Sequence, residues 1–575
     1  MCGIYGITEN NRQFIEKYIN TCSHRGPDGH DIYNDDAITL GHNLLSITDD
    51  ANVSKQPWKT PAGNILVYNG EIFNYFELLE KYPSFVPKTT CDTELLAWGL
   101  DSYGLNFIDQ IDSMHGFAYY NPNKRELVLS RDHAGIKPVF YAEIKQGLVF
   151  GSEIKGMLDL VPGSRNVDNL SLSLMTQIGI NVSDHTFFSG IKKLLSGQTI
   201  VYDLANKRIK TKHRIFIKPT SNHNFQREEF ISEAKKTIKI CSIGKRQIGV
   251  FLSGGLDSSL IAYELHQLLG SLNTFTNRIN PNQSIPEDHN SDADAASIFA
   301  KKIGFNHREI IITPKIIEEC WQHSIYHMEE PVYNPSMAMY CHTNKILSQS
   351  GTVITMAGDM GDEILGGYPK YWKLQEKIST GELKDWHSLI DTWMNRIKRP
   401  IKINMPHMSR DEIREYLIGH LPMELFNPKD MINSYMALDC ITQVPEEFFS
   451  RNDRYGMAYG REGRFPLATK SFMRYCLSIP SSFKIGPAKS ATKLLTKIAY
   501  KGLLPDVILQ KPKTGWTCPM AYWIKVVKVM QPFYLNSLKV HENVKAISAL
   551  TEKTMVPVWM MKDWANRYNM QFQIK

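Results

Sequence analysis

Residues 247–259 read QIGVFLSGGLDSS, and this stretch decides the fold of the longer part of the chain. An apolar run of strand length enters a glycine-rich turn, and a helical pattern follows from Ser259 to Leu269. Further strand-like runs occupy 273–278, 309–312 and 352–356, with a helical segment at 292–303. Strands that alternate with helices predict a parallel α/β sheet whose ligand sites lie at the carboxyl ends of its strands.

Two glycine-rich loops follow strands of this predicted sheet. In the first loop, glycines let the backbone approach a phosphate, and the next helix presents free N–H groups. It is not a Walker A loop, because no Gly-Lys-Ser/Thr follows. The second loop reads AGDMGDEILGGY over 357–368 and places Asp359, Asp362 and Glu363 together. Three carboxylates beside a glycine-rich loop favour metal binding and acid–base chemistry over a solvated turn.

The first 215 residues follow another pattern, of short strands and turns. Residues 65–68 form an apolar strand that runs into Asn69 and Gly70, a pair typical of turns. Hairpins are predicted at 117–130 and 139–151, and a helix from residue 93 to 103. The pattern breaks at 218–225, so we predict one domain at 1–215 and a second at 222–575, mainly helical beyond residue 371.

Composition limits the class of protein. The 575 residues are 42% hydrophobic and 22% charged, as in globular chains. Residues 1–200 carry 16 basic and 23 acidic side chains, and the remainder carries 50 and 36. The basic second part suits a nucleotide phosphate; without a Lys/Arg block interleaved with aromatics, we expect no nucleic acid. The sequence has no long apolar run, so we predict no membrane span. Its nine cysteines form no CxxC pair, which predicts neither a disulfide framework nor a zinc site. Because the N-terminus also does not look like a secretory signal, we predict a cytoplasmic location.

The N-terminus carries a candidate nucleophile. If Met1 is removed, Cys2 has a thiol and its own base, since an α-amine has a pKa of about 8. A cysteine at position 2 is usually incidental, but here CGIYGI is followed by HRGPD at 24–28 and NGE at 69–71. The Asn69 side chain and the Gly70 N–H would form an oxyanion hole, and Asp92 would hold an ammonium group.

These spaced motifs resemble the class II glutamine amidotransferases over about the first 200 residues. The resemblance implies an N-terminal nucleophile (Ntn) fold in which Cys2 attacks the amide of glutamine. Asn69 and Gly70 would stabilise the tetrahedral oxyanion. Glu71 and Asp92 would bind the α-amino group of glutamine. The whole set of residues expected to bind glutamine is Ile47, Asn69, Gly70, Glu71 and Asp92.

The later motifs resemble the ATP pyrophosphatases and the asparagine synthetases. By this resemblance Asp257 and Asp362 would bind Mg²⁺, and Asp359 would help ammonia to attack. Lys513, in the segment KPKTGW at 511–516, would stabilise charge on the α-phosphate. Segments at 453–454, 462–466 and 493–495 resemble the helical part of that family, where we interpret Glu462 and Arg464 as a structural pair. The expected ATP site comprises Leu252, Ser253, Gly254, Gly255, Asp257, Ser258, Ser259, Asn277, Ala357 and Gly358.

Taken in order, the motifs resemble the glutamine-hydrolysing asparagine synthetases over nearly the whole chain. The implied fold is an α+β Ntn glutaminase domain, an antiparallel β sandwich with helices, followed by an α/β ATP-pyrophosphatase domain with a parallel sheet and a helical C-terminal part. Glutamine would give ammonia in the first half, and ATP with Mg²⁺ would adenylate a carboxylic acid acceptor in the second. Ammonia would then cross an internal tunnel and displace AMP. The expected partners are the small molecules glutamine, ATP and the acceptor. The sequence does not decide whether the chain forms a homodimer.

The chain departs from the family pattern at three places. Leu44 stands where the family has an Arg that pairs with the glutamine α-carboxylate. Ala357 and Met360 replace a Ser and a Gly in the acidic loop, and residues 467–469 replace Phe-Leu-Asp. These changes leave the acceptor open between aspartate and another carboxylate, such as a sugar uronate or a biosynthetic acid. One alternative is an ammonia-dependent or intramolecular amide ligase, and the presence of Cys2 argues against it. A second alternative is a non-catalytic relative, and the retained acidic residues argue against that.

The Leu44 departure yields a prediction. A charged hydrogen bond of the lost Arg–carboxylate kind contributes about 1.5–3 kcal/mol. Without it, glutamine should bind about 10–100-fold more weakly unless another cation, for which Lys55 is the nearby candidate, replaces it. Leu44→Arg should therefore lower KM for glutamine by that factor in a glutaminase assay and leave adenylation unchanged. A low-micromolar wild-type KM that Lys55→Ala does not alter would contradict both versions.

Overall fold

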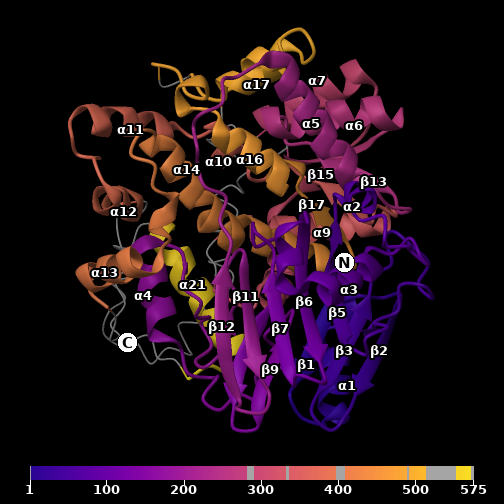
Figure 1. Ribbon diagram of the computed structural model, residues 1–575. Coiled ribbons are helices and arrows are strands. Elements are labelled where there is room, and N and C mark those ends of the chain that lie inside the picture. Colours follow the sequence, from indigo (N-terminus) through magenta and orange to yellow (C-terminus); the bar gives the residue numbers. More distant parts are fainter. Residues whose placement is uncertain are drawn as a thin grey trace.

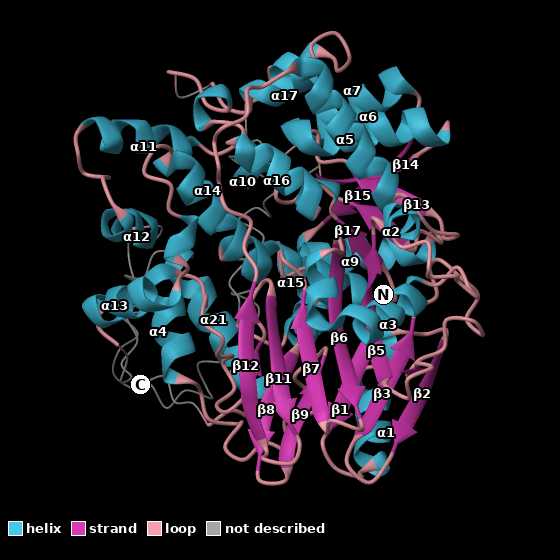
Figure 2. Ribbon diagram, in the orientation of Figure 1, coloured by secondary structure: helices cyan, strands magenta, loops and turns pink. Residues whose placement is uncertain are grey.

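The computed structural model describes residues 2–280, 290–331, 334, 336–395, 408–488, 491–512 and 552–571. Its N-terminal part consists of two stacked antiparallel sheets (Figures 1 and 2). The first sheet has the strand order β10 (Lys192–Lys193), β8 (Phe140–Ile144), β9 (Gly147–Gly151), β1 (Gly3–Ile7), β3 (Thr39–Leu44) and β2 (Gly29–Asn34). The second has the order β12 (Arg208–Arg214), β11 (Gln198–Asp203), β7 (Glu126–Arg131), β6 (Ser113–Asn121), β5 (Ile65–Ile72) and β4 (Trp58–Lys59).

Alternating side chains build the core of this sandwich. Ile4 of β1 and Val67 of β5 belong to the apolar layer between the sheets. The next residue, Tyr5, faces the opposite side and packs with Tyr18 of α1 (Arg12–Thr21). Helices α2 (Tyr75–Lys81) and α3 (Asp92–Tyr103) bury Leu78 and Leu96 in a cluster with second-sheet residues. The arrangement is the expected α+β sandwich with helices.

The second half contains a parallel sheet with the order β15 (Asn306–Ile312), β14 (Asn273–Ile279), β13 (Ile248–Phe251), β16 (Ile354–Met356) and β17 (Glu462–Arg464). Helices α5 (Arg227–Cys241), α6 (Leu256–Leu269) and α7 (Ser291–Ile303) share one apolar cluster with it. Helices α8 (Pro314–Met328) and α9 (Met337–Gln349) pack in another. The strand order reverses between β13 and β16, which is where open α/β sheets bind ligands.

The remaining chain is mainly helical, as predicted. Helix α4 (Asn169–Ile178) of the first half joins an apolar cluster with α11 (Pro369–Ser379), α12 (Trp386–Met394), α13 (Arg410–His420) and α14 (Met431–Ile441). The other helices are α10 (Gly361–Leu365), α15 (Ser450–Met457), α16 (Lys470–Ser478), α17 (Leu494–Ala499), α18 (Asp506–Leu509) and α21 (Glu552–Arg567), with a π-helix, η4, at Val444–Phe449. Short 3₁₀ turns lie at Ser23–Arg25, Gly104–Asp109, Met423–Leu425, Pro466–Ala468 and Ser481–Phe483. Within the described ranges, none of the helices has the length and apolarity to cross a membrane.

The structure confirms both predicted hairpins and the helix near residue 93. Two other local predictions, for residues 69–70 and 462–464, are wrong. Asn69 and Gly70 do not turn the chain but lie inside β5, paired with β6. Gly70 is required there because a Cβ would lie 2.3 Å from the carbonyl oxygen of Met114. Glu462 and Arg464 do not lie on a helix: they form the edge strand β17, next to the strand that leads into the acidic loop.

Candidate active sites

Cys2 lies directly before β1 and is buried. Its N–H donates to Oδ1 of Asn69 over 2.9 Å, and its Sγ lies 4.0 Å from the carbonyl oxygen of Leu45. The Nδ2 atom of Asn69 is buried and has no hydrogen-bond partner among the described residues. Burial raises the pKa of the Cys2 thiol, and the positive N-terminus opposes that shift. The structure thus brings a nucleophile and an amide donor together.

Two buried carboxylates lie beside this pair. Asp92 accepts hydrogen bonds of 2.9 Å from the Tyr68 hydroxyl and from the Ile72 N–H. Burial raises the pKa of Asp92 to about 6. Burial and the charge of Asp92 also raise the pKa of Glu71, which accepts a hydrogen bond of 3.2 Å from Arg464 on β17. An added ammonium group would stabilise the ionised forms of these two buried acids.

The segment after β3 contacts the second half of the chain. Ile47 is buried against Ile354 and accepts a backbone hydrogen bond of 2.9 Å from Lys245. Arg246 donates to the Ser46 carbonyl over 2.8 Å. Leu44 is buried at the end of β3, while Lys55 is exposed. The hypothesis that Lys55 replaces the missing Arg therefore stays a prediction.

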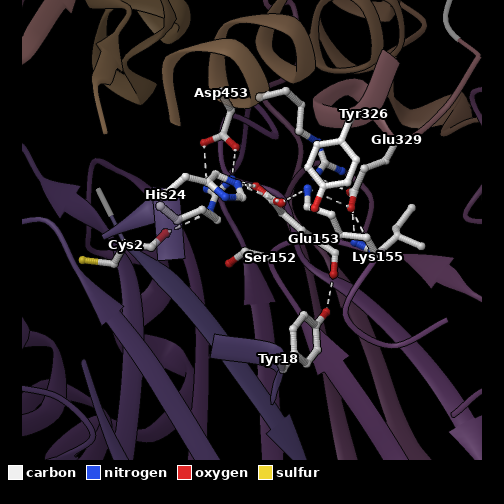
Figure 3. A network of polar contacts seen from close by, with 12 residues as sticks. Cys2, Tyr18, His24, Ser152, Glu153, Lys155, Tyr326, Glu329 and Asp453 are labelled. Carbon is white, nitrogen blue, oxygen red and sulfur yellow. Dashed lines mark hydrogen bonds and ion pairs between the residues drawn. The ribbon is translucent and has the colours of Figure 1, made fainter. Parts of the chain in front are cut away.

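A buried ion network joins the nucleophile to the second half (Figure 3). Arg25 is fully buried, and its Nε donates to the Cys2 carbonyl over 3.2 Å. Its two terminal nitrogens bind both oxygens of Asp453 at 2.9 and 3.2 Å, a bidentate pair across the halves. Glu153 accepts from Arg25 and pairs with Lys155, which also reaches Glu329. Sequence reasoning quoted these motifs without joining them, because no spacing links residue 25 to residue 453.

The glycine-rich loops form a second site at the strand-order reversal. The loops after β13 and β16 line a cavity of about 350 Å³. Glycines allow the close approach: a Cβ on Gly358 would lie 2.7 Å from the Asp257 side chain. Gly254 has φ +70, and a Cβ there would lie 2.2 Å from the Asp292 carbonyl. The wall contains these expected residues: Leu252, Ser253, Gly255, Asp257, Ser258, Ala357, Gly358, Asp359 and Asp362.

A lysine that sequence reasoning placed only by resemblance lies at the centre of the acidic groups. The Lys493 ammonium contacts Asp257 and lies 2.5 Å from Oδ1 of Asp362. Lys493 has φ +53, an unusual left-handed conformation for a non-glycine residue and one that often marks functional sites. Mg²⁺ takes one or two carboxylates and fills its shell with water and phosphate oxygens, so this facing pair fits it.

The other expected residues of this site lie at different places. Ser259 and Gly254 belong to the first loop and its helix, whereas the Asn277 side chain on β14 accepts a hydrogen bond of 2.9 Å from Thr343. Glu363 lines the cavity, and burial with the charge of Asp362 raises its pKa to about 8. Lys513 lies outside the described residues.

Comparison with known proteins decides the family. Residues 1–214 match the glutamine amidotransferase domain, and residues 232–549 match asparagine synthase. The chain belongs to the asparagine synthase family. With both a glutamine amidotransferase domain and an asparagine synthase domain, this chain is an ATP-dependent ligase that uses glutamine.

Individual relatives of this asparagine synthase family member are distant in sequence. It is 24% identical to asparagine synthetase [glutamine-hydrolyzing] 1 of Bacillus subtilis, over 91% of this chain and 88% of the relative. It is 23% identical to asparagine synthetase B [glutamine-hydrolyzing] of Escherichia coli, over 92% and 84%. A solved structure of the allosteric regulatory enzyme of purine biosynthesis matches with a TM-score of 0.31 and 12% identity, covering 55% of this chain and 81% of that one.

The Arg25 network predicts that a residue of the second half controls the first. Asp453→Asn should weaken the hold on Arg25 and loosen the Cys2 backbone, and misplacing a reacting group by about 1 Å can cost about 100-fold. We expect glutaminase kcat to fall about 10–100-fold, with ammonia-dependent amide synthesis largely kept. Asp563→Asn, a buried carboxylate that binds Trp321 instead, is the matched control. Equal losses in both variants would mean a general effect on stability.

The Asp92 pKa predicts the pH dependence of glutamine use. With a pKa of about 6, Asp92 is neutral below that pH and ionised above it. Only the ionised form attracts an ammonium group, so kcat/KM for glutamine should rise as the pH increases through about 6. Asp92→Asn should be poor at every pH and lose this step. A wild-type profile that is flat between pH 5 and pH 7, roughly one unit either side of that pKa, would rule out the role.

Proposed function

We propose that this enzyme hydrolyses glutamine at Cys2 and uses the ammonia to amidate a carboxylic acid that it first adenylates with ATP. The observation that carries the proposal is the pairing of two sites in one chain. A buried cysteine with an unsatisfied amide donor lies in the first half, and an acidic, glycine-lined cavity lies at the strand-order reversal of the second. Aspartate, the acid that asparagine synthetases amidate, is the leading acceptor.

In the first half, the free α-amine of Cys2 would take the thiol proton as the sulfur attacks the glutamine amide. The negative oxygen that forms would accept hydrogen bonds from Nδ2 of Asn69 and the N–H of Gly70. Glu71 and Asp92 would hold the glutamine ammonium. The carbon–nitrogen bond breaks to release ammonia, and water then hydrolyses the thioester to glutamate.

In the second half, an acceptor carboxylate oxygen would attack the α-phosphorus of ATP and displace pyrophosphate. The loop at 253–259 would cradle the departing phosphates, and Asp257 and Asp362 would hold Mg²⁺, which offsets phosphate charge when bound. The Lys493 ammonium adds a cation at the same point. Ammonia would attack the adenylated carbonyl, Asp359 would take its proton, and AMP would leave. Lys513 as the α-phosphate partner stays a prediction.

An acceptor other than aspartate is the second candidate, and Met360 is the observation that favours it. Its φ is +78, in the left-handed region where the family has Gly. The side chain is buried and lines the cavity. A methionine in a position built for glycine reshapes the pocket beside the adenylate, so an acid of another shape, such as a uronate, would fit.

Two variants test the proposal as a reciprocal pair. Cys2→Ala should lose glutamine-driven synthesis and keep synthesis from ammonium salts, because only ammonia release needs the thiol. Asp257→Asn should keep glutaminase activity and lose amide synthesis. The products, followed by ³¹P NMR, should be AMP and pyrophosphate. Stoichiometric ADP and phosphate, or glutamine-driven product from Cys2→Ala, would overturn the scheme.

A further inference from the structure

The segment 45–50, which follows β3, passes beside the nucleophile and rests on the second half of the chain. Its first carbonyl oxygen, that of Leu45, lies 4.0 Å from the Sγ of Cys2. Two of its side chains, Leu45 and Ile47, are buried and share an apolar cluster whose other residues all come from the second half: Ile248, Val353, Ile354 and Met457. A stretch of the first half that includes an expected glutamine-binding residue is therefore packed against the other half.

An arginine of the second half holds the backbone of this segment. The Nε of Arg246 donates to the Ser46 carbonyl over 2.8 Å. Its Nη2 donates to Oδ2 of Asp28 over 2.8 Å, and the same oxygen accepts from the Ser46 N–H over 2.9 Å. Arg246, Asp28 and Ser46 thus form a closed ring of hydrogen bonds. The neighbouring Lys245 N–H donates to the Ile47 carbonyl over 2.9 Å, so two successive carbonyls of the segment are bound by the second half.

The far end of the segment is held by charge. The Lys245 ammonium lies 3.5 Å from Oδ1 of Asp49. The other oxygen of Asp49 accepts from the N–H and the hydroxyl of Thr90, at 3.2 and 2.8 Å. Burial opposes the charge of Asp49, but the hydrogen bonds from Thr90 and the charge of Lys245 lower its pKa. Asp49 therefore joins a cation of the second half to the loop that carries Asp92, two residues after Thr90.

The Arg246–Asp28 pair matters for geometry more than for stability. The side chains of Arg246 and Asp28 are 40% and 25% exposed, and ion pairs with this access to water contribute little to folding. A guanidinium is nevertheless planar and offers its donors at fixed angles, so it sets the direction of two acceptors at once. Here those acceptors are one backbone carbonyl and the carboxylate that binds the N–H of the same residue.

We propose that Arg246 is a positioning residue of the glutamine site, which holds residues 45–49 in the form that binds glutamine. The inference rests on the proposed hydrolysis of glutamine at Cys2. Arg246 acts on the segment that contacts the substrate, whereas Arg25 holds the backbone of the nucleophile. The first half alone then lacks an ordered glutamine pocket, because residues 245 and 246 fix one part of it.

Steady-state glutaminase kinetics of the full-length enzyme test this role. Arg246→Ala should raise KM for glutamine about tenfold, between the small effect of an exposed ion pair and the roughly 100-fold effect of a 1 Å misplacement. The kcat at saturating glutamine and amide synthesis from ammonium salts should stay close to wild type. A merely structural defect would instead lower kcat through loss of active enzyme and leave KM unchanged. Arg246→Lys should recover part of the loss, since an ammonium lacks the planar fork.

A double-mutant cycle tests the ring itself. Asp28→Asn should also raise KM for glutamine, and the variant with both changes should be no worse than the weaker single variant, because either change opens the ring. Lys236→Ala is the matched control. It removes an ion pair between the halves, to Glu77 over 2.8 Å, whose side chains are 48% and 54% exposed and lie on α5 and α2. This control should leave KM for glutamine unchanged.

Three outcomes decide against the role. An unaltered KM in Arg246→Ala, while the wild type hydrolyses glutamine and Cys2→Ala does not, would overturn the positioning role and leave the proposed function standing. Strictly additive effects of the two changes, or an equal rise in KM in Lys236→Ala, would overturn the ring as its cause. Wild-type enzyme that leaves glutamine intact would overturn the proposed function together with the positioning role.

Discussion

The bidentate ion pair between Arg25 and Asp453 is the contact on which the arrangement of the two halves depends. A buried guanidinium is costly unless each of its donors is satisfied, and Arg25 is satisfied only by groups from both halves and by the Cys2 carbonyl. Removing the second half would take away the bidentate partner Asp453 and leave Glu153 as the one carboxylate bound to Arg25 next to the nucleophile. The geometry around Cys2 is therefore a property of the whole chain.

The second site depends on topology. Because the strand order reverses between β13 and β16, their loops diverge and leave a cavity, which two glycine-rich sequences line closely. The same reversal places β17 beside β16. Arg464 of β17 donates to Glu71 in the first half, while its carbonyl accepts from Ala357 at the start of the acidic loop. One residue thus contacts both sites.

Much of the fold could be predicted from the sequence, since hairpins and alternating strands and helices are local patterns. The parallel sheet followed from apolar runs that end in glycine-rich loops. The turn predicted at Asn69-Gly70 was wrong because glycine is typical both of turns and of strand positions where another backbone approaches closely. Strand β17 was missed because three residues with two charges do not look like a strand; its place at the sheet edge comes from pairing with β16.

The same distinction between local and distant sequence patterns applies to the site residues. Motif residues on one loop, such as Asp257 and Ser258, could be placed from the sequence because a contiguous motif carries the resemblance to a known family. The contacts of Arg25 and Lys493 could not, because their partners lie 428 and 236 residues away, and only tertiary packing brings them together. The sequence shows that these charged residues have no partner nearby along the chain, but it does not indicate which distant residue is the partner.

The apolar cluster that contains Tyr5 and Tyr18 also contains Trp321 and Trp564, so the two halves share a core. Shared cores limit modularity. A glutaminase half exchanged for that of a relative would bring side chains of other volumes to a surface packed at the density of a protein interior. The two halves of this enzyme are therefore not interchangeable modules, and chimaeras would need matched changes on both sides of the shared core.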